Sequence, residues 1–349
     1  MATIVPNSIY RMPAEWEPHA ATWLAWPHYE GDWPGKFEPI PWVYAEIVRN
    51  LARQERVELI VNDALSERRA RKVLQRADVQ LSNVSFHRWL TNRVWMRDSG
   101  CIFVKHGKSL AGVKWRFNAW AKYSNSKLDE KIGSLMAAVC GAAEVRPMFA
   151  GKRVVLEGGS IDVNGCGTLL TTEECLLSKV QQRNLGMNRE AYAKIFTESL
   201  GATNVIWLGN GISGDDTHGH VDDLSRFISP DTVATVVEPN ARDANYKPLR
   251  DNLRRLRAAH DQAGKRLNVV ELPMPRPVIF EGRRLPASYA NFYIANGIVL
   301  VPVFNDPNDY VALNTLAELF PSREIVPIYS GDLVWGLGTM HCMTQQQPK

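Results

Sequence analysis

The chain has 349 residues, of which 45% are hydrophobic and 22% charged, a composition typical of a globular protein with a large core. Its 41 Lys and Arg residues against 37 Asp and Glu residues give a net charge of +4 without a long block of like charge, which argues against a nucleic-acid or membrane partner. No apolar run approaches about 18 residues and no leader-like pattern opens the sequence, so we expect a cytoplasmic protein.

The sequence predicts one repeated unit, made of a strand, a return strand, a helix and a third strand. Period-two strand patterns, helical stretches and Asn-Gly turns at 164–165 and 296–297 carry this prediction. The expected segments are, in chain order, 21–26, 43–54 and 58–61 in a partial first copy; 100 to a turn at 106–107, 110–115, 127–140 and 144–148; 160–163, 167–171, 188–200 and 205–208; 224–228, 232–237, 247–264 and 267–272; and 289–294, 298–303, 309–320 and 325–329.

Five such units, none able to bury its apolar face alone, predict an α/β fold in which residues 1–349 form a single closed or solenoid-like domain. No low-complexity linker interrupts the series. The alternative is a plain α/β sheet whose regularity is accidental.

Cysteine is scarce, and one of the five cysteines stands out. The odd number and the absence of a Cys-x-x-Cys pair favour reduced thiols over a disulfide framework or structural zinc. Cys342 follows a glycine-rich stretch and His341 and precedes a run of Gln. We interpret it as a nucleophile, on the condition that a nearby His and a positively charged neighbourhood lower the pKa of the thiol. The alternative is a small buried hydrophobic residue, as most free cysteines are.

His220 and Asp222 are two residues apart, so on an extended strand they would project from the same face. With His218 they could also form half of a metal site. Gly219 interrupts this spacing, and the remaining histidines are scattered. We therefore expect no metal and no cofactor.

Further acids occur where units begin. Asp98 follows Arg97 in a partly apolar segment, and Glu157 precedes the Gly158-Gly159 pair, which permits close backbone approach. Several carboxylates around one thiol are costly to bury unless a cation satisfies them. A guanidinium is planar, permanently charged and bound well by carboxylates, and its central carbon is open to a thiolate. The combination of acids, His and Cys therefore points to guanidine hydrolysis rather than peptide cleavage.

Four motifs resemble the signatures of the agmatine deiminase / bacterial peptidylarginine deiminase family, within the guanidine-modifying superfamily. They are 95–100 (WMRDSG), 156–160 (LEGGS), 219–222 (GHVD) and 341–348 (HCMTQQQP), and the resemblance begins at 12–16 (MPAEW). It covers almost the whole chain. It implies a five-bladed α/β propeller of strand-strand-helix-strand modules, the pentein fold, in agreement with the five units.

The resemblance also implies roles for individual residues. Cys342 attacks the guanidinium carbon, while Asp98 and Asp222 clamp its nitrogens. His220 protonates the departing ammonia and then activates water, and Glu157 orients and charges His220.

The motifs give less information about which residues bind the part of the substrate remote from the guanidinium. The resemblance implies that Trp95 walls the aliphatic part of the substrate. Asp215 or Asp216 could hold the primary amine of agmatine. The loop at 211–217 is shorter than is common in the agmatine-specific members, and His218 and Asp223 depart from their pattern.

Agmatine is therefore the expected substrate, with peptidyl or free arginine as the alternative. The carboxylate of free arginine would need an Arg residue of the protein to bind it. Arg116, Arg283 and Arg284 remain candidates for that role. The remaining alternatives are a non-catalytic binder of arginine-like ligands and a metal hydrolase. We expect a small guanidinium compound as the partner, and self-association stays open.

Overall fold

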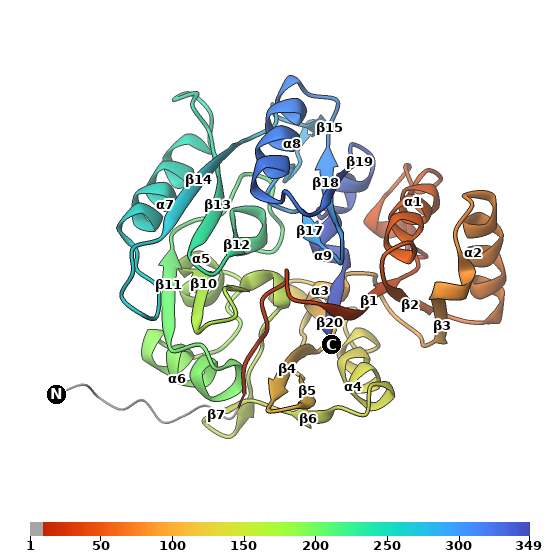
Figure 1. The fold of residues 1–349 in the computed structure, drawn as a ribbon, viewed down its shortest axis with the longest axis horizontal. Coiled ribbons are helices and arrows are strands. Elements are labelled where there is room, and N and C mark those ends of the chain that lie inside the picture. The colour runs from red at the N-terminus through yellow and green to blue at the C-terminus, as the bar shows by residue number, and fades with distance from the viewer. Residues whose placement is uncertain (1–9) are drawn as a thin grey trace.

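The computed structural model describes residues 10–349, which form a mixed α/β fold (Figure 1). Within these residues, five sheets share one pairing pattern. In each of them a central strand pairs antiparallel with one neighbour and parallel with the other. In sheet order they are β20 (Gln345–Pro348), β1 (His19–Ala25) and β2 (Arg56–Val61); β4 (Ile102–His106), β5 (Ser109–Val113) and β6 (Ala143–Val145); β9 (Asp162–Val163), β10 (Thr168–Thr172) and β11 (Asn204–Leu208); β12 (Ser225–Ser229), β13 (Thr232–Val237) and β14 (Asn268–Pro273); and β17 (Tyr293–Ile294), β18 (Ile298–Val303) and β19 (Glu324–Tyr329).

The first sheet is extended by a fourth strand, and two short hairpins lie apart from the five sheets. The fourth strand is β3 (Val84–Arg88), parallel to β2. The hairpins are β7 (Met148–Phe149) with β8 (Lys152–Arg153), and β15 (Ile279–Phe280) with β16 (Arg283–Arg284).

Long helices connect the parallel strands, because a parallel pair needs a crossover. They are α1 (Ile40–Ala52), α2 (Ala64–Arg76), α4 (Asp129–Val139), α6 (Arg189–Leu200), α7 (Tyr246–Ala258) and α8 (Pro307–Leu319). The short helices are α3 (Met96–Ser99), α5 (Glu173–Leu177) and α9 (Met340–Met343), with 3-10 turns η1 (Glu30–Asp32), η2 (Leu81–Asn83), η3 (Ala119–Ala121), η4 (Gly158–Ser160), η5 (Val221–Asp223) and η6 (Leu333–Gly336). In Figure 1 the long helices lie toward the outside, and α3 and α9 lie toward the middle. Within residues 10–349, no helix combines the length and apolarity that a membrane crossing requires.

Local sequence explains the best-defined boundaries. The side chain of Asn188 caps α6 by accepting from the backbone N–H of Ala191, and the helix ends at Gly201 with φ 74°. Asp306 and Asp309 form a capping box at the start of α8. Gly297, with φ 75°, lies in the turn between β17 and β18. The strands predicted at 232–237 and 298–303 have those bounds in the structure.

Other predicted boundaries were wrong. The helix predicted to reach residue 264 ends at Ala258, because Ala259 is extended. Of the strand predicted at 289–294, only Tyr293–Ile294 pairs with β18, and Asn291 instead directs its amide to Asp223, 3.0 Å from Oδ1. The first unit, predicted as partial, is completed by β20, which pairs antiparallel with β1. The prediction also missed α2 and β3.

The short central helices bring the four motifs together. Helix α3 packs against α9 and η4, and η4 packs against η5. Most apolar side chains around them are fully buried, including Met96, Leu156, Val221 and Met340. The polar residues on these short segments are therefore held in a dry and closely packed setting.

Candidate active site

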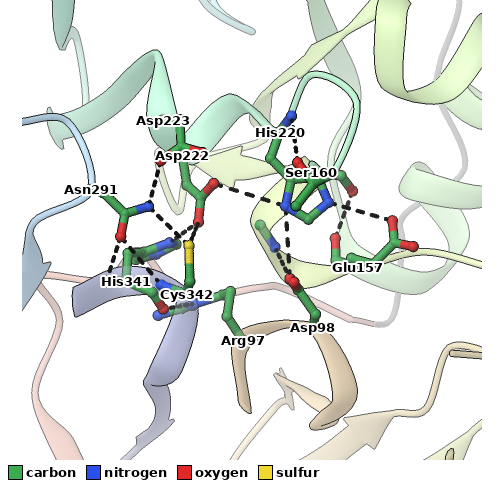
Figure 2. A network of polar contacts seen from close by, with 12 residues as sticks. Arg97, Asp98, Glu157, Ser160, His220, Asp222, Asp223, Asn291, His341 and Cys342 are labelled. Atoms are coloured by element: carbon green, nitrogen blue, oxygen red, sulfur yellow. Dashed lines mark hydrogen bonds and ion pairs between the residues drawn. The ribbon is translucent and has the colours of Figure 1, made fainter. Parts of the chain in front are cut away.

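Five predicted residues converge on one site, although they are far apart in the sequence (Figure 2). Asp98 lies on α3, Glu157 precedes η4, His220 precedes η5, Asp222 lies on η5 and Cys342 lies on α9. All five are buried. The backbone from His220 to Asp222 is a 3-10 turn rather than the predicted strand, but both side chains still face the site.

The imidazole of His220 lies among three carboxylates. Nε2 is 3.6 Å from Oε2 of Glu157, whereas Nδ1 is 3.9 Å from Oδ1 of Asp98 and 4.0 Å from Oδ1 of Asp222. Burial acts to lower the pKa of His220, but Asp98 and Glu157 outweigh it and raise the pKa well above the ordinary value. The ring is therefore an imidazolium at neutral pH, with a proton available for a leaving group.

Glu157 is kept ionised by Arg183, which the sequence analysis missed. Nε of Arg183 donates to Oε1 of Glu157 at 3.0 Å, and neither side chain is exposed. Burial acts to raise the pKa of Glu157, but Arg183 and His220 lower it to about 2. Arg183 also donates to the backbone carbonyl of Thr217 at 2.5 Å. This one side chain thus fixes both the acid behind His220 and the loop before it.

Asp98 is held in place by two donors. The indole N–H of Trp120 donates to Oδ2 at 2.9 Å, and the backbone N–H of Gly159 donates to Oδ1 at 3.1 Å. Burial raises the pKa of Asp98 to about 6, despite the opposing charge of His220. The neighbouring Arg97 turns away and donates to Gln346 at 2.7 Å. Asp98 is thus not neutralised by the arginine next to it in the sequence.

Asp222 receives a hydrogen bond from the residue next to the thiol. His341 Nδ1 lies 2.7 Å from Oδ2 of Asp222, and its Nε2 lies 2.8 Å from Oε2 of Glu15. Burial acts to raise the pKa of both acids, but His341 and Arg226 contribute to lowering both below their usual range. His341 thus links the carboxylates of Asp222 and Glu15 through its two ring nitrogens.

The surroundings of Cys342 correct one expectation. Its thiol donates to Oδ2 of Asp222 at 3.7 Å, and its sulfur accepts from Nδ2 of Asn291 at 3.1 Å. Burial, Asp222 and Asp223 raise the pKa of the thiol well above its usual value, so the predicted thiolate-stabilising neighbourhood is absent among residues 10–349. The thiol is neutral until a cation enters the site.

Gly159 has no side chain, which allows His220, Asp222 and Asp98 to approach its backbone closely. A Cβ atom on Gly159 would lie 2.5 Å from Nδ1 of His220, 3.0 Å from Oδ2 of Asp222 and 3.1 Å from Oδ1 of Asp98. Among the described residues, the two ring nitrogens of His220 and Oδ1 of Asp222 have no hydrogen-bond partner. Oδ1 of Asp222 is therefore an unused acceptor for a cationic group, whereas the charged ring of His220 has donors to offer.

A cavity of about 130 Å³ leads from Cys342 and Asp98 toward the exposed side chain of Arg283. Its aromatic wall includes Trp95, the residue that was expected to contact the aliphatic chain of the substrate. The lining residues are Gly31, Asp32, Pro34, Arg93, Trp95, Asp98, Trp120, Tyr123, Asp216, Thr217, Arg283, Trp335, Gly336, Leu337 and Cys342.

The two acids expected at the far end of the substrate differ in position. Asp215 does not line this cavity, and its oxygens accept from the backbone N–H groups of Thr217 at 2.7 Å and Gly219 at 2.6 Å. Asp216 lines the cavity, where it pairs with Lys122 and accepts from the hydroxyl of Tyr123 at 2.5 Å. Asp215 therefore shapes the loop, and Asp216 faces the cavity.

The structure also locates the residues that were considered as metal ligands or as binders of a substrate carboxylate. His218 lies 3.1 Å from Oγ of Ser178, away from the site. Within the described chain, the groups able to hold a metal ion are Glu157, Cys175 and His220, and Asp222, Asp223 and Cys342, neither of which includes His218. Of the three arginines, Arg284 pairs with Asp243 at 2.8 Å, and only Arg283 lines the cavity.

Several residues of the site had little signal in the sequence. Arg183 lies in a segment without strand or helix periodicity, and Asn291 lies within a predicted strand. His341 could have been suspected from its position beside Cys342, and Glu15 from its place in the first motif of the resemblance.

Comparisons with known proteins match nearly the whole chain. The sequence profile of the family described as Porphyromonas-type peptidyl-arginine deiminase matches residues 11–348. The agmatine deiminase of Pseudomonas syringae pv. tomato is 34% identical over 97% of this chain and 95% of its own length. The structure of Enterococcus faecalis agmatine deiminase has a TM-score of 0.90 and 30% identity, covering 99% of both chains. A cysteine-to-serine variant of C. jejuni agmatine deiminase, solved with substrate bound, has a TM-score of 0.86 and 31% identity, covering 97% of this chain and 96% of its own.

Proposed function

Because the chain belongs to the Porphyromonas-type peptidyl-arginine deiminase family, we propose that it is an agmatine deiminase, which converts agmatine and water to N-carbamoylputrescine and ammonia. The observation that carries this proposal is the buried thiol of Cys342, which faces the carboxylate of Asp222 and lines the same cavity as Asp98. A guanidinium matches these carboxylates in charge and in geometry.

The first step is binding. The guanidinium enters through the cavity that Asp98 and Cys342 line, and Asp98 and Asp222 accept from its nitrogens. Its positive charge opposes the effect of the nearby carboxylates on Cys342 and so lowers the pKa of the thiol. The substrate thereby generates its own nucleophile, and the thiol proton leaves to solvent through the cavity.

The second step forms the covalent intermediate. The thiolate of Cys342 attacks the central carbon, forming a C–S bond. His220 transfers its proton to the departing nitrogen, the C–N bond breaks, and ammonia leaves. Glu157, itself fixed by Arg183, stabilises the charged form of His220 before this transfer.

The third step is hydrolysis. The now neutral His220 takes a proton from water, and the resulting hydroxide attacks the carbon of the thiouronium. The C–S bond then breaks, the proton of the added hydroxyl passes to sulfur, and N-carbamoylputrescine leaves while the neutral Cys342 thiol is restored. The carboxylates of Asp98 and Asp222 hold the carbon in line with sulfur throughout, so that little entropy is lost at the moment of reaction.

A substrate panel tests the proposed function. Ammonia release is measured with agmatine, free arginine and an arginyl peptide side by side, with iodoacetamide or EDTA added to parallel samples. We expect agmatine to have the highest kcat/KM, prolonged preincubation with iodoacetamide at alkaline pH to abolish turnover, and EDTA to leave turnover unchanged. Preference for arginine or the peptide, or loss of activity with EDTA, would contradict the proposal.

One observation favours a second candidate, deimination of free or peptidyl arginine. Arg283 lines the cavity, is exposed, and has its guanidinium 5.6 Å from the ring of Trp335. It could meet the carboxylate that agmatine lacks. The same panel decides between the two substrates.

We also propose that the five sheets with the same pairing pattern are the blades of a five-bladed propeller. We propose further that residues 1–349 act as one catalytic domain and that the protein acts in the cytoplasm. The pairing of β20 with β1 supports closure, because it joins the two ends of the described chain. Cooperative unfolding in one transition, followed by both tryptophan fluorescence and activity, is the expected result for a single domain.

A further inference from the structure

Asp32 is a buried acid of the cavity with an unused oxygen. It ends η1 and lines the same cavity as Cys342, and its side chain is 1% exposed. Arg93 donates to its Oδ1. Its Oδ2 is buried and has no hydrogen-bond partner among residues 10–349.

Of the three acids that line the cavity, Asp32 is the one with an oxygen that accepts no hydrogen bond. Asp216, the other carboxylate at this part of the cavity, is already satisfied by Lys122 and by the hydroxyl of Tyr123. At the reacting end, both oxygens of Asp98 accept hydrogen bonds. A buried carboxylate oxygen without a donor is unfavourable, and a cationic ligand with N–H groups relieves it.

The guanidinium of Arg93 is held in place beside Asp32, although its buried Nε has no hydrogen-bond partner among residues 10–349. Its guanidinium carbon lies 4.2 Å from the ring centre of Tyr123 and 5.3 Å from that of Tyr29, so aromatic rings hold it in place while it bonds to Asp32. Burial, opposed by Arg93, raises the pKa of Asp32 to about 7, and the charge of Asp216 adds to that rise. Arg93 and Lys122 balance the charges of Asp32 and Asp216, so the unsatisfied group at this part of the cavity is Oδ2 of Asp32.

We propose that Oδ2 of Asp32 binds the terminal ammonium of the substrate and thereby selects guanidines that carry a primary amine at their far end. This inference rests on the proposed deiminase function and deepens it. The aliphatic chain between the two cationic ends then runs along Trp95, which lines the same cavity and packs 5.7 Å from the ring of Trp33, the residue after Asp32.

The variant Asp32→Asn tests this assignment, because it keeps the shape and removes the charge. We measure kcat/KM for agmatine and for n-butylguanidine, which has the same reacting group and a methyl in place of the ammonium-bearing end. The wild-type protein should prefer agmatine. In the variant, kcat/KM for agmatine should fall by about 10- to 100-fold, the loss typical of a hydrogen bond to a charged group, and kcat/KM for n-butylguanidine should change little.

A matched control is Asp332→Asn, which removes a carboxylate that pairs with Lys36 and does not line the cavity. It should leave both substrates unchanged. Equal losses for both substrates in Asp32→Asn, or an unchanged preference for agmatine, would overturn the assignment.

An inhibition experiment on the wild-type protein needs no variant. With n-butylguanidine as substrate, 1,4-diaminobutane should inhibit more strongly than n-butylamine, because only the diamine reaches both acidic ends of the cavity. Equal inhibition would overturn the assignment while leaving the deiminase function intact. Turnover of neither guanidine would instead contradict the proposed function.

Discussion

Arg183 and Glu157 form a solvent-excluded ion pair, with Nε of the arginine 3.0 Å from Oε1 of the glutamate and neither side chain exposed. A buried pair of this kind adds little net stability compared with apolar side chains, but removing one partner leaves an uncompensated charge. Its value to the protein lies in holding a fixed negative charge 3.6 Å from the ring of His220.

Replacing Arg183 by Gln should therefore damage both folding and catalysis. We expect the free energy of unfolding to fall by about 3–5 kcal/mol, the usual result of breaking a buried ion pair. Urea unfolding measures it. The control is Arg189→Gln, which breaks an exposed pair with Glu173 and should cost less than about 1 kcal/mol. Similar small losses for both variants would mean that the buried pair is not important for stability.

Activity should be lost in acid as Asp98 takes up a proton. Its pKa is raised to about 6, and the clamp requires the ionised form, so kcat/KM for agmatine should fall as pH decreases through about 6. Asp98→Asn should lose about a thousandfold or more in kcat, because it removes one charge of the clamp in the transition state. A loss below about tenfold would show that Asp98 is not part of the clamp.

Gly159→Ala should abolish turnover without unfolding the protein. The added Cβ would lie 2.5 Å from Nδ1 of His220 and 3.1 Å from Oδ1 of Asp98, so both catalytic side chains would have to shift. We expect kcat/KM to fall by at least about a hundredfold, as when a reacting group is displaced by a fraction of an ångström. Gly209→Ala is the control, because its Cβ would meet the side chain of Asp251 at 3.1 Å. Retained activity in Gly159→Ala would show that the positions of these two side chains are not critical for turnover.

Alkylation should report the raised pKa of Cys342. The measurement uses Cys166→Ser protein, which lacks the exposed cysteine, and follows loss of activity with iodoacetamide at increasing pH. Because the thiol is neutral at rest, inactivation should be slow at neutral pH and should accelerate as pH rises beyond the usual thiol range. Fast inactivation that does not depend on pH would show a preformed thiolate.

His341→Gln tests a positioning role. The imidazole of His341 lies 2.7 Å from Asp222 and 2.8 Å from Glu15 and lowers the pKa of Asp222, and a glutamine amide cannot contact both carboxylates through two ring nitrogens. We expect a lower kcat, together with an acid limb of the pH profile shifted to higher pH. A lower kcat with an unshifted profile would indicate only a packing defect.

The amino-acid pattern was most informative where local chemistry decides the structure. Turns with Asn-Gly and strands such as Ile298–Val303 depend on neighbouring residues, so their signals are present in the sequence. The motif residues were likewise predicted to meet, and Asp98, Glu157, His220, Asp222 and Cys342 do lie together.

What could not be predicted depends on partners distant in the chain. The Gln-rich segment that forms β20 has no alternation of apolar and polar residues, and its strand pairing exists only because β1 lies beside it. Asp32 and Arg183 have no periodic or motif signal, because their roles come from the cavity and from a buried partner. The expected pKa of Cys342 was wrong for the same reason, since it depends on acids brought from remote segments.

The pairing of β20 with β1 has a consequence for how activity is acquired. The strand follows Cys342 after two residues, so the thiol is oriented by contacts that join opposite ends of the described chain. An incompletely folded molecule can gather its acids yet lack a fixed nucleophile, since contacts between distant segments form slowly. Only molecules in which both ends of the described chain have paired can therefore turn over substrate. Partly folded molecules do not hold the sulfur of Cys342 in a reactive position.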